Sequence, residues 1–446
     1  MPNLKKIILL LGDIVVLYLS LLLTLFIRYG ADFDMSRWNQ HFWSFTIIYV
    51  LWLIVFYVAG LYELTLARNN VAFYSTLGRG LIINASLATA FFYFIPYFGI
   101  TPKTNLFLTL TAFALLFTFW RQAYNHLLKI SSLTNNVLVI GENGRNKEIN
   151  QIKDIIKDNP QLGYRMTKQI SPKKIQTPFD LLEMATQKNI KTIITAINPH
   201  YDSKLVQSLY QCLPLKIGFS DLPSFYEKIL GKVPISSIGE IWFLENLTES
   251  QKNFYETTKR VLDMLGALIL GSISLFFYPI IILAIKLDSS GSVFYTQRRI
   301  GHDGQIFKVI KFRSMIEEAE KNGAQWADQQ DHRITNAGRF MRKTRLDELP
   351  QLWNILIGQM SFIGPRPERI EFVQQLEKEI PYYQIRHIVK PGLTGWAQVN
   401  FHYGASVKDS IEKLQYELYY IKHRSSILDL SIVLRTIKIV LKGGGR

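Results

Sequence analysis

Four long apolar runs fill most of the first 120 residues and constrain the fold more than any other feature of the sequence. They cover Ile7–Ile27, Phe42–Leu61, Leu81–Phe98 and Leu106–Trp120. A helix needs about 20 apolar residues to cross a bilayer. The first run is too long for a cleaved secretory signal and lacks a small-residue cleavage site. The sequence therefore predicts a four-helix transmembrane bundle over residues 1–130.

The charges between these runs indicate how the bundle is oriented. Cations stand before run one, between runs two and three, and after run four, whereas the first loop balances two arginines against two aspartates. These residues are Lys5, Lys6, Arg68, Arg79, Arg121 and Lys129, and in the first loop Arg28, Arg37, Asp32 and Asp34. Because positive charge favours the cytoplasmic side, we expect both ends of the bundle in the cytoplasm. Asp13, inside the first run, is expected to face the bundle interior.

Composition narrows the classes of ligand. The 446 residues are 48% hydrophobic and carry a net charge of +16. Such a charge suits nucleic acid, an anionic membrane surface or phosphate-bearing substrates, but no nucleic-acid-binding motif is present, so we expect no nucleic-acid partner. A single cysteine, Cys212, excludes internal disulfides and multi-cysteine metal sites.

The middle of the chain has an α/β pattern. Asn136–Gly141 has the composition of a buried strand, and Glu142–Asn146 then opens a helical stretch through Ile156. This is half of a dinucleotide-binding fingerprint, because its third glycine is missing. A second strand is expected over Lys191–Ala196. We therefore predict a Rossmann-like α/β domain over residues 131–250, with a structural or regulatory role favoured over a working nucleotide site.

A fifth apolar run, Val261–Ile285, differs from the other four. Lys259 and Arg260 precede it and Lys286 follows it, so neither flank is favoured for translocation. Pro279 interrupts it, and proline breaks or kinks a helix. The pattern favours a re-entrant membrane helix over about residues 258–287 that enters and leaves on one side. An ordinary fifth span is the alternative.

Two adjacent carboxylates, Asp347 and Glu348, stand among Arg342, Lys343 and Arg345. A carboxylate surrounded by cations can attack a phosphate, because the cations neutralise the phosphate oxygens and the second carboxylate can bind a metal. The alternative is structural: Asp347 caps a helix whose first turn contains Glu348 and Pro350.

Further motifs follow the fifth run in a fixed order. They are Phe294–Gly301, Lys311–Met315, Gly338–Arg342, Leu346–Leu352, Met360–Pro367 and Lys390–Gln398. In this order the chain resembles the bacterial sugar transferases, which are polyprenyl-phosphate hexose-1-phosphate transferases. The four apolar runs and the α/β insert resemble the long-form members that initiate exopolysaccharide or O-antigen synthesis. The expected fold is a mixed membrane protein with a four-helix bundle, a Rossmann-like domain and an α-rich monotopic catalytic domain over residues 251–446.

The resemblance implies roles for individual residues. Asp347 would be the catalytic nucleophile and Glu348 its partner, binding Mg²⁺. The cations near the phosphates would be Lys311, Arg313, Arg342 and Arg366, and Pro279 would break the re-entrant helix. Three positions depart from the family pattern: Tyr278 and Arg345 replace common serines, and Gln359 replaces a frequent acid.

The implied reaction joins a soluble donor to a membrane acceptor. Asp347 would attack the β-phosphate of a UDP-sugar, with glucose or galactose as the sugar, and release UMP. Undecaprenyl phosphate would then accept the sugar phosphate, which implies a bacterial inner-membrane protein that contacts membrane lipids and has a cytoplasmic catalytic domain. The resemblance to the long-form members is compatible with a homodimer. One alternative is a membrane-bound NAD-dependent nucleotide-sugar dehydratase, for which Tyr255 and Lys259 have the required spacing. Another is a non-catalytic scaffold of polysaccharide assembly.

Overall fold

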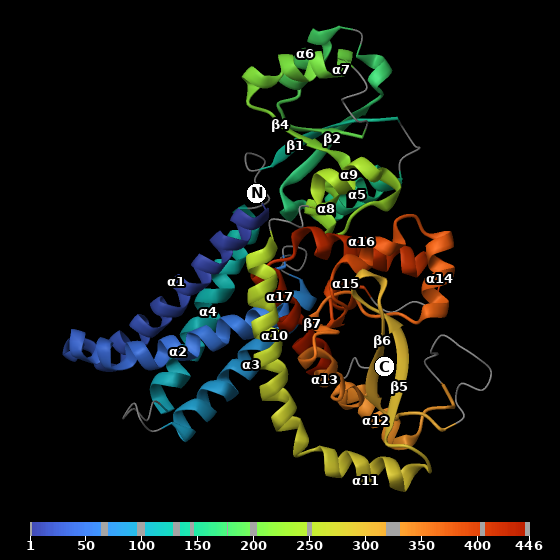
Figure 1. The fold of residues 1–446 in the computed structure, drawn as a ribbon. Coiled ribbons are helices and arrows are strands. Elements are labelled where there is room, and N and C mark those ends of the chain that lie inside the picture. The colour runs from blue at the N-terminus through green and yellow to red at the C-terminus, as the bar shows by residue number, and fades with distance from the viewer. Residues whose placement is uncertain are drawn as a thin grey trace. The chain divides into compact units, whose positions relative to one another are not determined.

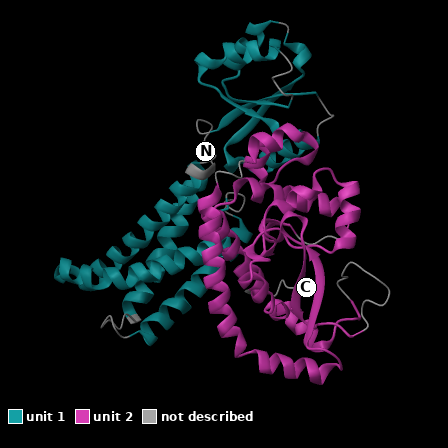
Figure 2. Cartoon of the chain, in the orientation of Figure 1, with its two compact units in different colours: residues 1–222 teal, residues 223–446 magenta. Residues whose placement is uncertain are grey.

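The chain folds into two compact units, Met1–Leu222 and Pro223–Arg446, which are named here the N-terminal and C-terminal units (Figure 2). The computed structural model describes residues 2–63, 70–95, 103–127, 134–142, 147–175, 177–196, 203–247, 252–317, 331–401 and 406–441. The third predicted span ends at Phe98, which lies outside these residues, as do Arg68, Lys129 and Asn143–Asn146 of the half fingerprint.

The four predicted spans form four long helices at the start of the N-terminal unit. They are α1 (Pro2–Tyr29), α2 (Met35–Ala59), α3 (Val71–Phe94) and α4 (Lys103–Leu127) (Figure 1). All four are long and apolar enough to cross a membrane. Side-chain caps fix two of the starts: the Asp34 carboxylate accepts from the Arg37 amide, and the Asn70 side chain accepts from the Phe73 amide.

Aromatic side chains and one ion pair fill the core of the bundle. Trp52, Phe56 and Phe113 are fully buried, and the ring of Phe113 contacts the rings of the other two. Asp13 faces the interior as expected, where one oxygen accepts from Arg121 at 2.6 Å and the other from Trp120 at 3.1 Å. The bundle core therefore contains a fully buried pair of opposite charges.

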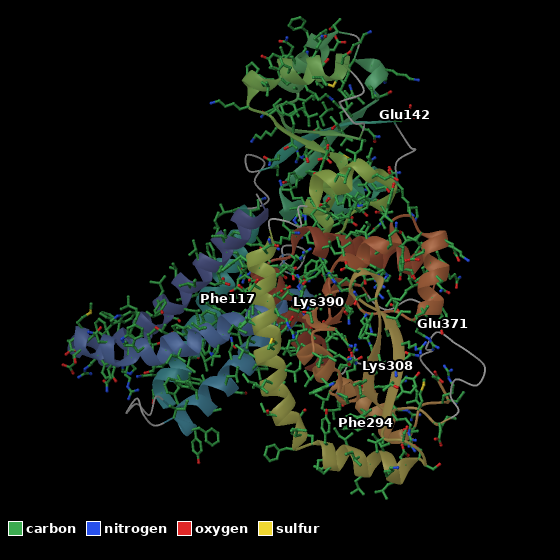
Figure 3. The ribbon with its side chains drawn as sticks, in the orientation of Figure 1. Phe117, Glu142, Phe294, Lys308, Glu371 and Lys390 are labelled. Atoms are coloured by element: carbon green, nitrogen blue, oxygen red, sulfur yellow. The ribbon has the colours of Figure 1, made fainter. Side chains whose placement is uncertain are left out.

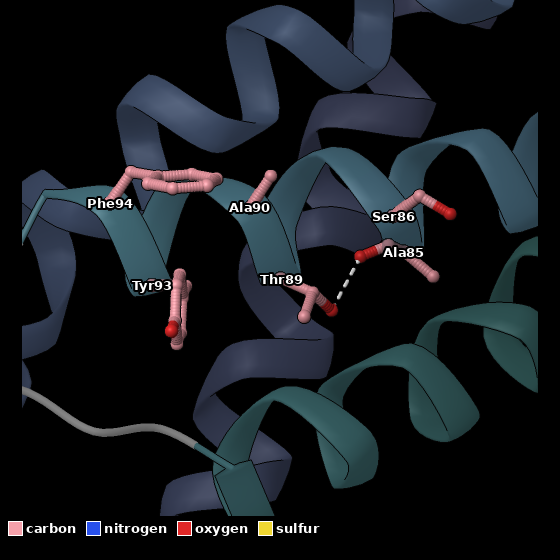
Figure 4. Close-up of a pocket in the computed structure, with 6 residues that line it drawn as sticks. All are labelled: Ala85, Ser86, Thr89, Ala90, Tyr93 and Phe94. Carbon is pink, nitrogen blue, oxygen red and sulfur yellow. Dashed lines mark hydrogen bonds between the residues drawn. The ribbon is translucent and has the colours of Figure 1, made fainter.

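A shallow hollow lies on the surface of α3. Its lining residues are Ala85, Ser86, Thr89, Ala90, Tyr93 and Phe94 (Figure 4). The Thr89 hydroxyl is already bonded to the Ala85 carbonyl at 2.9 Å, and the rings of Tyr93 and Phe94 are largely exposed. None of the described residues that line this hollow carries a carboxylate, amine or imidazole, so these residues offer no group suited to phosphate chemistry.

A small parallel sheet follows the bundle in the N-terminal unit. Its strands are β1 (Asn135–Ile140), β2 (Tyr164–Ile170), β3 (Ile190–Thr195) and β4 (Gly218–Asp221), in the order β2-β1-β3-β4. Helices α5 (Lys147–Asp158), α6 (Pro178–Gln187) and α7 (Ser203–Gln211) alternate with the strands. Both strands predicted from the sequence are present, as β1 and β3. Leu138, Ile140 and Ile193 form the buried centre of this domain, as expected for parallel strands covered by helices.

The C-terminal unit contains mostly helices around two small sheets. Its helices are α8 (Leu222–Leu230), α9 (Glu240–Asn246), α10 (Asn253–Leu275), α11 (Tyr278–Asp288), α12 (Asn336–Thr344), α13 (Gln351–Leu356), α14 (Ile370–Glu379), α15 (Trp396–Asn400), α16 (Val407–His423) and α17 (Ser426–Leu441). Strands β5 (Phe294–Ile300) and β6 (Ile306–Phe312) form an antiparallel hairpin, and β7 (Ser361–Ile363) pairs with β8 (Gly392–Thr394) in parallel. Val233 and Trp242 share a buried core with Val373 and Leu414.

The fifth apolar run is broken at Pro279, as the sequence predicts. Helix α10 ends at Leu275, α11 begins at Tyr278, and their axes differ in direction by 60° (Figure 1). Pro279 lies in the first turn of α11, where its missing N–H costs no helical hydrogen bond. A pair of helices bent in this way fits either a broken span or a re-entrant loop.

The buried ion pair of the bundle yields a stability prediction. Asp13→Asn removes the negative charge and leaves the Arg121 guanidinium buried without a counter-ion. We expect the free energy of unfolding to fall by on the order of 3–5 kcal/mol, measured by thermal unfolding of the detergent-purified protein. Asp32→Asn, at an exposed position after α1, is the matched control and should change stability little. Equal stability of the two variants would contradict the importance of the pair.

Candidate active site

The two adjacent carboxylates lie in a turn between two helices of the C-terminal unit. Helix α12 ends at Thr344. Arg345 caps it with a left-handed backbone (φ 62°), and a 3-10 turn, η12 (Leu346–Glu348), follows. The start of α12 lies close to the chain at Ser314, because a Cβ on Gly338 would lie 2.0 Å from the Ser314 carbonyl oxygen. Glycine at this position therefore lets α12, which precedes the turn, pack against the segment that follows the hairpin.

Glu348 is buried and surrounded by three cations. Arg366 donates to Oε1 at 2.6 Å, Lys311 lies 3.4 Å from the same oxygen, and Arg345 lies 3.5 Å from Oε2. Burial opposes the charged form, yet Arg366, Lys311 and Arg345 outweigh it and hold the pKa of Glu348 well below its usual range. Glu348 therefore stays ionised and keeps the cations together.

Asp347 is equally buried but differs in its partners. Its Oδ1 atom has no hydrogen-bond partner among the described residues. Burial raises the pKa of Asp347 to about 6, and the charge of Glu348 adds to this, while Lys311, Arg342 and Arg366 act in the opposite direction. Neighbouring carboxylates with pKa values driven apart are typical of sites where the two groups have different chemical roles.

The structural alternative for Asp347 does not match its surroundings. Pro350 occupies the N-cap position of α13, and η12 has no side-chain cap. Within the described segment 331–401, Asp347 therefore does not cap a helix.

The structure brings most of the expected cations to the carboxylates. Lys311 comes from β6, Arg366 from the loop after β7, and Arg342 from α12, where its Nε donates to the Ser314 hydroxyl at 2.9 Å. Burial lowers the pKa of Arg342, although Asp347 acts in the opposite direction. Three chain segments thus place positive charge around one pair of carboxylates.

Two of the expected site residues lie elsewhere. Arg313 donates to the carbonyl and the hydroxyl of Ser289, at 2.8 and 3.0 Å, and no contact joins it to Asp347 or Glu348 in the described structure. Its Nε and Nη1 atoms are buried without partners among those residues. Pro279 lies at the break between α10 and α11.

Asn354 is a supporting residue that motif reasoning missed. Its amide oxygen accepts from the Ile310 amide at 3.1 Å, and its nitrogen donates to the Lys308 carbonyl at 2.7 Å and to Gln359 at 2.9 Å. These bonds join α13 to the hairpin that carries Lys311; Figure 3 labels Lys308 on β6. No local motif marks Asn354, because Asp347 lies in η12 and Asn354 in α13, so helical spacing does not relate the two side chains.

A second buried amide lies on the helix that follows the carboxylates. Gln351 is 2% exposed, and its Nε2 has no hydrogen-bond partner among the described residues. A buried polar group without a partner is uncommon. The site therefore contains a donor, Gln351 Nε2, and an acceptor, Asp347 Oδ1, that have no hydrogen-bond partner among the described residues.

The carboxylates fit a magnesium ion only if the substrate supplies further ligands. No group of three or more metal-ligating side chains occurs among the described residues. Mg²⁺ is commonly bound by one or two carboxylates together with substrate phosphates. Asp347 Oδ1 is without a partner, and Glu348 is ionised beside it, so the two side chains suit this kind of shared site.

Because the pKa of Asp347 is raised, we expect replacement of its carboxylate by a neutral group to stabilise the folded protein. Its pKa of about 6 lies above the ordinary 3.8, so this group destabilises the fold increasingly as pH rises from about 4 to 6. We expect Asp347→Asn to raise the free energy of unfolding at pH 7.5 by on the order of 3 kcal/mol, a gain that disappears toward pH 4. Thermal unfolding at both pH values measures this.

Glu348→Gln is the matched control, because the pKa of Glu348 is shifted downward. Its ionised form stabilises the fold above its unfolded pKa, so this variant should be less stable at pH 7.5, by an amount that shrinks as pH falls. If both variants lost stability alike at pH 7.5, the assignment of different ionisation states would be wrong.

Comparison with known proteins identifies relatives of the segment that holds these carboxylates. Residues 254–443 match the family model described as bacterial sugar transferase. A UDP-N-acetylgalactosamine-undecaprenyl-phosphate N-acetylgalactosaminephosphotransferase from Aeromonas hydrophila is 42% identical over 240 residues, 53% of this chain and 55% of that protein. A UDP-glucose:undecaprenyl-phosphate glucose-1-phosphate transferase from Escherichia coli (strain K12) is 46% identical over 162 residues, 35% of this chain and 34% of that protein.

A longer match includes part of the N-terminal unit. A UDP-glucose:undecaprenyl-phosphate glucose-1-phosphate transferase from Xanthomonas campestris pv. campestris is 30% identical over 351 residues, 73% of this chain and 70% of that protein. The matches to the Aeromonas and Escherichia proteins span about half and one third of those relatives. On the family match and the Xanthomonas alignment together, the chain belongs to the bacterial sugar transferase family.

Proposed function

We propose that this chain transfers a hexose-1-phosphate from a UDP-sugar to undecaprenyl phosphate and releases UMP. The observation that carries the proposal is Asp347, a buried carboxylate with an unpartnered oxygen beside Lys311, Arg342 and Arg366. Relatives in the family are named for transfer of this kind. The reaction would be the first membrane step of exopolysaccharide or O-antigen synthesis.

The first half-reaction is displacement at the β-phosphorus of the donor. An Asp347 oxygen forms a bond to this phosphorus, and the bond from phosphorus to the bridging oxygen breaks, so that UMP leaves and a glycosyl phosphate remains on the aspartate. The raised pKa of Asp347 makes its ionised form a stronger nucleophile than an exposed aspartate. Arg366, Lys311 and Arg342 offset repulsion between the carboxylate and the phosphates.

The second half-reaction regenerates the enzyme. A phosphate oxygen of undecaprenyl phosphate attacks the phosphorus of the aspartyl phosphate, and the bond to Asp347 breaks, which releases the lipid diphosphosugar and the free carboxylate. Splitting the transfer in two allows a soluble donor and a lipid acceptor to use one site in turn.

Glu348 would hold Mg²⁺ together with donor phosphate oxygens. The ion, when bound, would supply additional positive charge to the phosphates. Glu348 is suited to this because its charge is maintained by Arg366, Lys311 and Arg345.

The contacts of the broken helix pair support a re-entrant arrangement. At its start, Arg260 donates to the Ile355 and Leu356 carbonyls at 2.6 and 2.7 Å, beside the helix that follows the carboxylates. At its end, Asp288 accepts from the Ala337 amide at 2.7 Å, beside the helix that precedes them. Both flanks thus bind the same folded unit, which favours a return to one side. UDP-sugars are cytoplasmic, so we propose the cytoplasmic face of the bacterial inner membrane.

The dehydratase alternative is weakened by the contacts of its two key residues. Tyr255 donates to Asp429 Oδ2 at 2.8 Å, and Lys259 lies 3.1 Å from the same oxygen. Both groups are thus engaged in packing α10 against α17. A scaffold without catalysis would not need Asp347, so the effect of Asp347→Asn on UMP release distinguishes it from the transferase.

The test of function is UMP release by purified full-length protein in nanodiscs with Mg²⁺ and undecaprenyl phosphate. The donors are UDP-glucose, UDP-galactose and, because relatives are named for it, UDP-N-acetylgalactosamine. We expect release with one donor, loss of at least about 1,000-fold in Asp347→Asn, and loss with EDTA. Arg313→Lys, outside the cluster, is the control that should retain most activity. Release unaffected by Asp347→Asn would refute the mechanism, and no release with any donor would return the scaffold to consideration.

The topology prediction uses single cysteines in a Cys212→Ser background. Phe254→Cys and Ser290→Cys lie at exposed positions on the two flanks of the helix pair, and Asp32→Cys lies after α1. A membrane-impermeant maleimide should label both flanks in inverted vesicles and Asp32→Cys in intact spheroplasts, because both flanks bind one unit. Labelling of the two flanks from opposite sides would favour a fifth span.

A further inference from the structure

The loop that carries Arg366 is held by hydrogen bonds from other segments of the C-terminal unit. Pro365 and Pro367 lack N–H groups, which limits the hydrogen bonds that the loop can form within itself. Four consecutive carbonyls, those of residues 365–368, instead accept bonds from elsewhere. The donors are the Gly392 amide at 2.8 Å, Arg386 at 2.9 Å, Arg299 at 3.0 Å and the Ile300 amide at 3.1 Å.

Only one of these four donors binds residue 366 itself. Arg386 Nη2 donates to the Arg366 carbonyl, and on its other side the same guanidinium forms two bonds of 2.8 Å to the carboxylate of Glu417. Arg386 and Glu417 are both 2% exposed. The pair lies in η13 (Tyr383–Ile388) and in α16, outside the motifs that contain the carboxylates.

The Arg386–Glu417 pair is linked to the carboxylates through the side chain of Arg366. Its carbonyl is bound by Arg386, and its Nη2 donates to Glu348 at 2.6 Å. Fixing the backbone of Arg366 limits where its guanidinium can lie. A chain of contacts therefore runs from Glu417 through Arg386 and Arg366 to Glu348.

We propose that Arg386 and Glu417 are positioning residues for the sugar-phosphate transfer, acting by fixing Arg366 where its guanidinium meets Glu348 and the donor phosphates. This role rests on the proposed function. Arginine suits it because its planar fork bonds to the carboxylate with Nε and Nη2 while Nη2 also reaches a carbonyl. A lysine retains the charge but cannot form this set of bonds. Glu417 keeps the buried guanidinium neutralised and oriented.

The experiment is a double-mutant cycle on UMP release by the full-length protein in nanodiscs. Arg386→Lys is combined with Arg366→Lys, and kcat and KM for the UDP-sugar are normalised to the folded fraction. We expect Arg386→Lys alone to lower kcat by about 10- to 100-fold, as for residues that orient an active-site group, with KM changed by less than about 3-fold. In the Arg366→Lys background, the same substitution should lower kcat by less than about 2-fold further.

Two variants separate positioning from general stabilisation. Glu417→Asp retains the charge but shortens the reach, and it should lower kcat in the same way as Arg386→Lys. Glu227→Gln, which disrupts another buried carboxylate bound to α16 through Lys422 and His423, should reduce thermal stability and leave kcat unchanged.

The outcomes distinguish this proposal from the proposed function. If the wild type is active and Arg386→Lys has a normal kcat per folded protein, the positioning role is refuted while the transferase activity stands. The same holds if the reduction in kcat of the double variant equals the product of the reductions in the two single variants. If wild type releases no UMP with any donor, the proposed function fails and the positioning role fails with it. A loss in Arg386→Lys that vanishes in the Arg366→Lys background supports both.

Discussion

The contact on which the site depends is the short ion pair between Glu348 and Arg366. Two neighbouring carboxylates cannot both be buried and charged without compensation, because desolvation and mutual repulsion both oppose ionisation. Here Glu348 takes the closest cations, at 2.6 and 3.4 Å for Arg366 and Lys311. Asp347 is left with more distant charges and an oxygen without a partner in the described structure. Because the cations bind Glu348 more closely than Asp347, the two carboxylates have different pKa values.

The surrounding structure serves to bring distant segments to this pair. Asn354 joins α13 to the hairpin, Ser314 receives Arg342, and Gly338 allows α12 to approach Ser314. Each contact is ordinary alone. Together they place cations from β6, α12 and the loop after β7 around one turn, which suits a site for a multiply charged diphosphate.

Sequence reasoning predicted features that depend on local pattern. Hydropathy predicted the four long helices, buried-strand composition predicted β1 and β3, and Pro279 predicted the helix break. Contiguous motifs predicted a cluster of carboxylates and cations, and in the structure Lys311 and Arg366 lie against Glu348. The sequence could not predict that Arg313 binds Ser289. Its spacing of two residues from Lys311 would put both side chains on one face of a continuous strand, but β6 ends at Phe312 and Arg313 lies beyond it. Nor does any local pattern of Val233 or Trp242 indicate that they pack against Leu414.

The prolines beside Arg366 have a consequence for how the protein acquires its site. The carbonyls of residues 365–368 accept hydrogen bonds from donors in β5, η13 and β8, so the loop is not held in place until these donors are present. Formation of the ion pair with Glu348 must therefore wait for long-range contacts, which form late because closing large loops is entropically costly. A nascent chain thus carries the paired carboxylates before Arg366 is held beside them, and assembly of this cluster coincides with completion of the C-terminal unit.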